Sequence, residues 1–179
     1  LLKQKPSVWG DEYLGGLDYL GVSHFSTFFS YILSYGPHAP PLYFFIQYLL
    51  CGKFGMPIET FRWVVIFFNL ITVNFVYLIA RHFLPRKYAI GVVALFILSP
   101  ILLWNSASLR YHSIAYMLAM LSLYFLFKHF ITPQKVSGYA VIVQIGINIL
   151  LVLSHTIFVW LIGFEIFLLT LKAVSYTHL

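Results

Sequence analysis

Five strongly apolar stretches follow one another along the last two thirds of the chain, and polar residues mark the breaks between them. The stretches cover residues 63–80, 88–109, 111–127, 136–154 and 156–172. Each comes close to the roughly 20 residues with which an α-helix crosses the hydrocarbon core of a bilayer. The pattern therefore predicts an all-α, polytopic membrane protein with about five transmembrane helices.

The beginning of the chain has a different pattern. Residues 1–24 are polar and rich in glycine, which is typical of a loop. Residues 25–34 place phenylalanines at helical spacing opposite serines, which favours a short helix lying in the membrane interface. Residues 39–52 are uncharged but too few to span, so we expect an interfacial or re-entrant helix there.

We expect one incomplete membrane domain that covers residues 1–173. It would consist of a first outer loop with juxtamembrane helices (1–62) and the transmembrane helices (63–173). The last six residues, 174–179, back-translate to a sequence that resembles a transposon-type sequencing adapter. We interpret them as a non-native tail on an N-terminal fragment of a longer protein, and we expect this fragment to be inactive on its own.

Composition agrees with this class of protein. Hydrophobic residues make up 61% of the chain and charged residues only 9%, whereas soluble domains carry roughly a quarter of charged residues. The net charge of +6 does not indicate nucleic-acid binding, because the basic residues are scattered and several fall in short loops between helices. The single cysteine, Cys51, excludes an internal disulfide.

Five spans divide the charged residues between two sides of the membrane. One side receives six basic residues and no acidic one: Arg81, Arg86, Lys87, Lys128, Lys135 and Lys172. The other five lysines and arginines fall on the opposite side, so the tight basic turn at 85–87 and the absence of acidic residues decide that this side is cytoplasmic. The outer side receives Asp11, Glu12, His38, Glu59, Arg62, Arg110, His112 and His155. If residues 39–52 crossed the membrane instead, the acidic pair would share a side with the basic turn at 86–87.

Asp11 and Glu12 are the only adjacent carboxylates among the five acidic residues of the chain. A carboxylate held near a hydroxyl can act as a general base. Arginines at a membrane face can bind phosphate through their fork of N–H groups. Together they suit transfer from a lipid-phosphate donor, in which a cation stabilises the departing phosphate. The alternative is a solvated loop whose charges only set topology.

Four segments in order carry a family resemblance. They read W-G-D-E from Trp9, H-A-P-P-L-Y-F from His38, F-G-M-P-I-E-T-F-R from Phe54, and L-S-P-I-L-L-W-N-S-A-S-L-R-Y from Leu98. In this order they resemble the GT-C superfamily of membrane glycosyltransferases, related to protein O-mannosyltransferases and bacterial aminoarabinose transferases. The resemblance covers about residues 9–160.

The resemblance implies an enzyme that moves a sugar from a polyprenyl-phosphate-linked donor to a hydroxyl of a lipid, glycan or protein acceptor. It implies a multi-pass protein of the bacterial inner membrane with its site on the outer face. Asp11 would be the general base and Glu12 its partner. The substrate-binding residues would be His38, Tyr43, Arg62, Arg110, Tyr111 and His155.

Several alternatives stay open at this level. His38 could simply begin a helix at the interface, and Arg110 could only anchor a helix end. No histidine pair has the i, i+4 spacing of a helical metal site, so we predict no tight zinc site and no cofactor, with a divalent metal left open. The rival function is a non-enzymatic transporter or flippase-like protein, in which Asp11 and Glu12 would form a gate.

Several polar residues lie inside the apolar stretches and indicate contacts between the helices. Glu165 is the one acidic residue deep in a predicted helix, and we expect it to pair with Lys172 or with a polar neighbour such as Asn148. We expect the amides among these residues to form hydrogen bonds between helices. They are Asn69, Asn74, Gln144 and Asn148.

Overall fold

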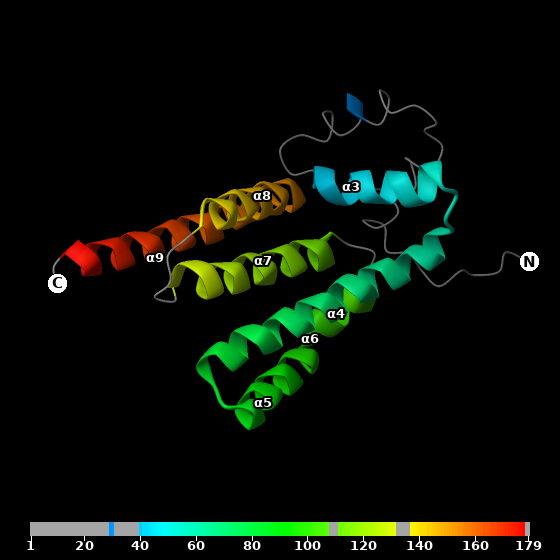
Figure 1. Cartoon of the computed structure of the whole chain (residues 1–179). Helices are drawn as coiled ribbons and strands as arrows, with labels where there is room; N and C mark the ends of the chain where they lie inside the picture. The colour runs from blue at the N-terminus through cyan, green and yellow to red at the C-terminus, as the bar shows by residue number, and fades with distance from the viewer. Residues whose placement is uncertain (1–28, 31–39, 108–110, 132–136, 178–179) are drawn as a thin grey trace, which may run out of the picture.

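The computed structural model describes residues 29–30, 40–107, 111–131 and 137–177, and every regular element in these ranges is a helix (Figure 1). The α-helices are α3 (Pro41–Gln47), α4 (Ile58–Phe83), α5 (Arg86–Ile97), α6 (Pro100–Ala107), α7 (His112–Leu126), α8 (Gly138–Ser154) and α9 (Val159–Thr177). Shorter turns are η2 (Tyr48–Lys53), η3 (Phe127–Ile131) and η4 (Thr156–Phe158). The predicted all-α class is confirmed for the described residues.

Helices α4 and α5 pack as one hairpin and α7 and α8 as another, with α7 lying between α4 and α8 (Figure 1). After Pro85 the chain reverses from α4 into α5. The end of α4 meets the end of α7, where the rings of Phe83 and Phe127 have centroids 5.1 Å apart. At the opposite end, Ser113 Oγ donates to the Asn105 carbonyl over 3.5 Å and so joins the start of α7 to α6.

The apolar stretch 88–109 was predicted as one transmembrane helix, but the structure divides it. Helix α5 ends at Ile97, and α6 begins at Pro100. Proline has no N–H to donate and its ring clashes with the preceding helical turn, so a helix restarts at Pro100 instead of running through it. Ser99 Oγ accepts from the N–H of Leu102 over 3.4 Å at this new start.

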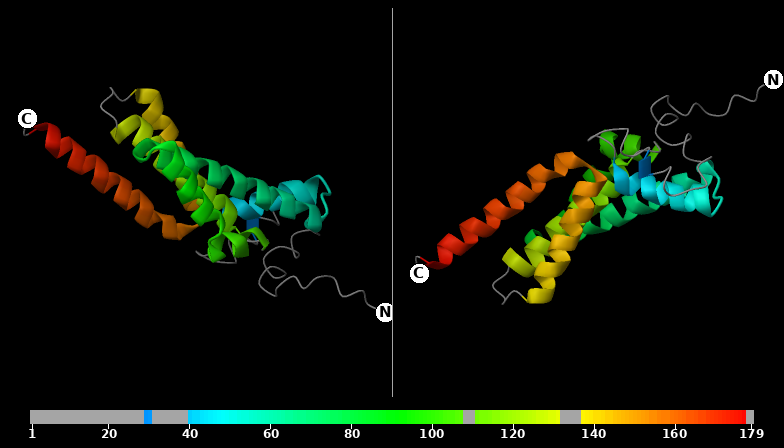
Figure 2. Two further views of the ribbon diagram at one scale, coloured as in Figure 1. Left: turned by 90° about the horizontal axis from the view of Figure 1, so that it is seen from below. Right: turned by 90° about the horizontal axis from the view of Figure 1, so that it is seen from above.

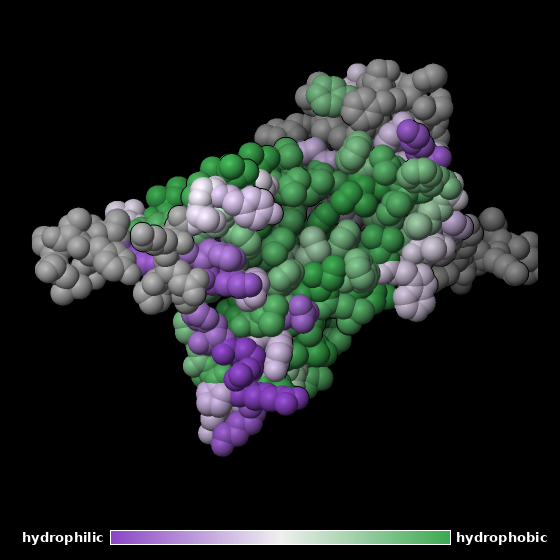
Figure 3. Space-filling model, in the orientation of Figure 1, coloured by the Kyte–Doolittle hydropathy of each residue, from purple (hydrophilic) through white to green (hydrophobic). Residues whose placement is uncertain are grey.

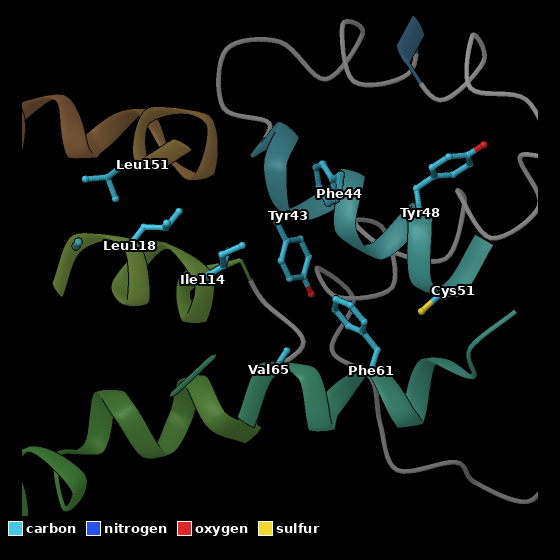
Figure 4. Close-up of a cluster of buried hydrophobic side chains, with 10 residues drawn as sticks. Tyr43, Phe44, Tyr48, Cys51, Phe61, Val65, Ile114, Leu118 and Leu151 are labelled. Atoms are coloured by element: carbon cyan, nitrogen blue, oxygen red, sulfur yellow. The ribbon is translucent and has the colours of Figure 1, made fainter. Parts of the chain in front are cut away.

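The segment from α3 through η2 agrees with the prediction of a short, non-spanning helix. Its 13 residues, Pro41 to Lys53, would extend about 20 Å at helical rise, less than the roughly 30 Å of a hydrocarbon core. Tyr43 and Phe44 of α3 are buried against residues of α4, α7 and α8 (Figure 4). This packing fixes α3 at one end of the hairpins. Of the interfacial helix predicted at 25–34, only residues 29–30 are described, and they are helical.

Among the residues that the structure describes, two helices are long and apolar enough to cross a membrane, Thr60–Phe83 and His112–Ile131. Only 22% and 33% of their most apolar windows are buried, whereas a core helix of a soluble protein is mostly buried. Gly138–Ser154 is apolar but shorter. The count of five spans therefore stays a prediction.

The outer surface of the hairpins is hydrophobic. Large apolar side chains point outward from several helices, such as Leu70 of α4, Leu95 of α5, Ile142 of α8 and Trp160 of α9, which is 82% exposed. Figure 3 shows a broad hydrophobic face, with hydrophilic residues gathered toward the turn between α4 and α5. Contiguous apolar surface of this kind marks a protein or membrane interaction face.

Candidate functional site

Tyr43, Tyr111 and His155 lie together at one end of the helix hairpins. The Tyr43 and Tyr111 ring centroids are 6.4 Å apart at 74°, and those of Tyr111 and His155 are 5.0 Å apart at 43°. The three residues come from α3, the turn before α7, and the end of α8. Three of the six predicted substrate-binding residues, far apart in the sequence, thus form one aromatic cluster.

His155 is placed by the break between α8 and α9. Its backbone is extended, with φ −170° and ψ 127°, so α8 stops at Ser154. Its Nδ1 accepts a hydrogen bond from the Ile157 N–H over 3.1 Å and caps the short turn η4. Because Nδ1 is an acceptor here, a neutral imidazole carries its proton on Nε2, the nitrogen that can donate to a phosphate or hydroxyl oxygen.

His112 belongs to the same cluster, although it was predicted only to lie on the outer face. Its ring centroid is 4.3 Å from that of Tyr111, and it stacks on His155 at 6.3 Å and on Tyr116 at 6.1 Å. The sequence signal that could have included it is its position directly after Tyr111, at the first turn of α7. The cluster therefore offers two imidazoles beside two phenols.

Tyr43 is held by the helices on both sides of it. It is 5% exposed, and its ring packs edge-on against Phe61 of α4 with centroids 5.8 Å apart (Figure 4). Phe61 is fully buried, so α4 keeps a fixed position relative to α3 at this point. A tyrosine held in this way can present its hydroxyl with little loss of side-chain entropy.

Arg62 follows Phe61 in the first turns of α4 and is half-buried. Its Nε is buried and has no hydrogen-bond partner among the described residues. A buried donor without a partner is costly, and a phosphate oxygen is a favourable partner for a guanidinium. Arg62 is thus suited to bind an anionic group near Phe61, and its substrate-binding role stays a prediction.

The remaining predicted site residues lie outside the described residues. They are Asp11, Glu12, His38 and Arg110. Glu59 lies in α4, but its side chain is likewise not described. The roles predicted for these residues therefore stay predictions.

Four of the basic residues assigned to the cytoplasmic side lie at the other end of the hairpins, whereas Lys53 and Arg62 do not. Arg81 lies in the last turn of α4, Arg86 and Lys87 begin α5, and Lys128 lies in η3. The contact between Phe83 and Phe127 brings these segments together. The separation of this basic end from the aromatic cluster is what the topology predicted from charge requires.

Within the described ranges, no three or more His, Cys, Asp or Glu side chains are grouped closely enough to hold a metal ion. Comparisons of the chain with protein-family models, with curated proteins and with solved structures gave no match. The proposed function therefore rests on the residues of this chain alone.

Proposed function

We propose that this chain is a glycosyltransferase of the GT-C type, which moves a sugar from a polyprenyl-phosphate donor to an acceptor hydroxyl. One observation carries most of the weight. Tyr43, Tyr111 and His155, which the resemblance assigns to substrate binding from three distant segments, lie within one cluster of rings. The meeting of these three residues in one cluster supports the shared substrate-binding role that the resemblance implies.

The chemistry follows from the residue types. Asp11 takes the proton of the acceptor hydroxyl, and Glu12 positions it. The acceptor oxygen then forms a bond to the anomeric carbon of the sugar while the bond from that carbon to the phosphate oxygen breaks. The electron pair of the broken bond leaves on polyprenyl phosphate, whose charge Arg62 and Arg110 stabilise.

The proposed location is a multi-pass position in the bacterial inner membrane, with the site on the outer face. The exposed apolar side chains of α4, α5, α8 and α9 support a lipid environment. The basic end, with Arg86 and Lys87 in the turn after α4, supports a cytoplasmic position for that end. The aromatic cluster lies at the opposite end.

A transporter or flippase-like protein is the second candidate, and one observation favours it. Glu165 is a buried acid in an apolar helix, and such residues often lie on ion or proton pathways. The cluster of Tyr43, Tyr111 and His155 gives this candidate no particular support.

An assay that follows both the sugar and the lipid separates the two candidates. The full-length enzyme would be reconstituted in liposomes with polyprenyl phosphate that carries radiolabelled mannose or aminoarabinose, together with bacterial membrane extract as the acceptor source. The proposal expects label in a lipid, glycan or protein fraction, and protein-free liposomes as the control without label. Movement of the intact donor between leaflets without any transfer would instead establish the transporter.

A further inference from the structure

A polar cluster lies in the middle of the helices, away from the aromatic cluster of Tyr43, Tyr111 and His155. It consists of Ser122 of α7, Gln144 and Asn148 of α8, and Glu165 of α9. Ser122 is fully buried, and Glu165 is 2% exposed. The expected hydrogen bond between Glu165 and Asn148 is confirmed. The other expected partner, Lys172, donates instead to the Phe130 carbonyl.

Three of these side chains form a closed ring of short contacts. Ser122 Oγ lies 2.5 Å from Glu165 Oε1. Asn148 Nδ2 lies 2.8 Å from Glu165 Oε2. Asn148 Oδ1 lies 2.7 Å from Ser122 Oγ and completes the ring. All three separations are normal only for hydrogen bonds, so each contact needs one hydrogen.

The hydrogens available can be counted. The Ser122 hydroxyl has one hydrogen, and the Asn148 amide supplies one, because only its nitrogen carries hydrogen. Exchanging the oxygen and nitrogen of Asn148 moves these hydrogens but does not alter their number. The third hydrogen has to come from Glu165. We infer that Glu165 is a neutral carboxylic acid that donates to Ser122 or Asn148, so that the cluster is a proton-binding site inside the helix bundle.

Gln144 completes the pattern. Its Nε2 lies 2.7 Å from Ser122 Oγ and 3.1 Å from Glu165 Oε2. With the carboxyl proton on Oε1, Ser122 Oγ accepts from Glu165 and Gln144 and donates to Asn148, while Oε2 accepts from both amides. An ionised Glu165 would leave two oxygens facing each other without a hydrogen, which is unfavourable in a buried, low-dielectric site.

No described cation compensates for an ionised Glu165. Its hydrogen-bond partners, Ser122, Gln144 and Asn148, are all uncharged. The lysines of the neighbouring elements are engaged elsewhere. Lys172 Nζ donates to the Phe130 carbonyl, and Lys128 Nζ of η3 lies 5.5 Å from the centroid of the Tyr124 ring.

The cluster is open to one side through a groove of about 550 Å³ between α8 and α9. Gln144, Asn148 and Glu165 line it together with apolar side chains such as Ile149 and Ile166. Figure 2 shows α9 diverging from α8 beyond the turn that joins them. Gln144 Oε1 is buried with no hydrogen-bond partner among the described residues, and it supplies an acceptor for a water that would carry the proton to or from Glu165.

The site takes up one proton as the carboxylate becomes a carboxylic acid, and releases it by the reverse step. Infrared difference spectroscopy of the whole chain in lipid nanodiscs at pH 7 tests this directly. The wild type should show the carbonyl band of a protonated acid, and the band should shift on exchange into D₂O. Glu165→Gln should lose the band completely, and Asp18→Asn, which removes a different carboxyl group, should retain it.

A second measurement uses only the wild type, so it does not depend on whether Glu165→Gln folds. Dicyclohexylcarbodiimide is an apolar reagent that adds to protonated carboxyl groups, and peptide mass analysis of the wild type should find the adduct on Glu165 in severalfold excess over Glu59. A protonated-acid band together with the adduct supports the inference. Absence of the band from folded wild-type protein would overturn it, as would a band that persists unchanged in Glu165→Gln.

Discussion

His155 ends α8 and also caps the turn that follows, so its two ring nitrogens can have different roles. Nδ1 accepts from Ile157 N–H, which leaves Nε2 as the atom that would reach a substrate. The cap can be kept while the second nitrogen is removed, because a shorter side chain with an acceptor atom near Nδ1 can replace it. A pair of variants therefore separates structure from binding.

His155→Asn should retain the cap and melt close to the wild type, but it should lose most of the sugar transfer. His155→Ala should lose both, with a cost of about 1 kcal/mol in the free energy of unfolding for the missing cap. Thermal melting in detergent and initial transfer rates would be measured for both variants. Full transfer by His155→Asn would show that His155 is only a helix cap.

Cys51 gives a prediction that depends on pH. Burial raises the pKa of the Cys51 thiol, because the thiolate loses its hydration. The reactive thiolate is therefore scarcer at pH 8 than for an ordinary cysteine, and it becomes common only at a higher pH. We expect slow alkylation by iodoacetamide in the folded chain, and rates that continue to rise above pH 9.

The matched control for Cys51 is the same chain unfolded in denaturant. Its thiol should react severalfold faster at pH 8, as a free thiol of ordinary pKa does. Equal rates for folded and unfolded protein would mean that Cys51 is not buried in α3–η2 packing.

At the scale of the helices, Ser122 and Ser154 form an informative pair. Both are fully buried. Ser122 connects α7 to α8 and α9, whereas Ser154 Oγ donates to the Leu151 carbonyl within its own helix over 2.6 Å. Removing the hydroxyl therefore has different consequences at the two positions.

Ser122→Ala should destabilise the bundle by about 1–3 kcal/mol, because it removes the hydrogen-bond partner of the buried Glu165 Oε1. Ser154→Ala should cost less, since the Leu151 carbonyl keeps its helical hydrogen bond. Chemical unfolding in detergent compares the two. A larger loss for Ser154→Ala would contradict the cross-helix role of Ser122.

Sequence pattern located the helices well, because uncharged runs and their charged or proline-rich borders are local signals. The break at Ser99 and Pro100 was visible in the sequence, but hydropathy alone gave no reason to end a helix there. The cluster around Ser122 was harder to predict. Glu165 and Asn148 could be paired from their polarity, but Ser122 is an ordinary helix residue until α7 packs between its neighbours.

The candidate site could be predicted only in part, because sequence motifs are local and the packing of distant segments is not. Tyr43, Tyr111 and His155 were singled out by their motifs, and the packing of three separate segments brings them together. The position of His112 directly after Tyr111 was a local signal, but its stacking on His155 depends on how α7 meets α8. Asp11, Glu12, His38 and Arg110 lie outside the described residues, so their part of the site rests on the motifs alone.

At the scale of the whole molecule, the basic end and the aromatic cluster should face opposite sides of the membrane. A single new cysteine in a Cys51→Ser background tests this. Lys87→Cys, at the start of α5, should react with a membrane-impermeant maleimide only after the cells are permeabilised. Thr156→Cys, which is exposed beside His155, should react in intact cells. The reverse pattern would invert the topology and exclude an outer site.

The most direct test of the proposed function is the acidic pair itself. Initial rates of labelled sugar transfer from polyprenyl phosphate would be compared for the wild type, Asp11→Asn and Asp18→Asn in the same membranes. Asp11→Asn removes the proposed general base and should lower the rate by about 10²-fold or more, whereas Asp18→Asn should transfer like the wild type. Unchanged transfer by Asp11→Asn would remove Asp11 from the chemistry and contradict the proposed mechanism.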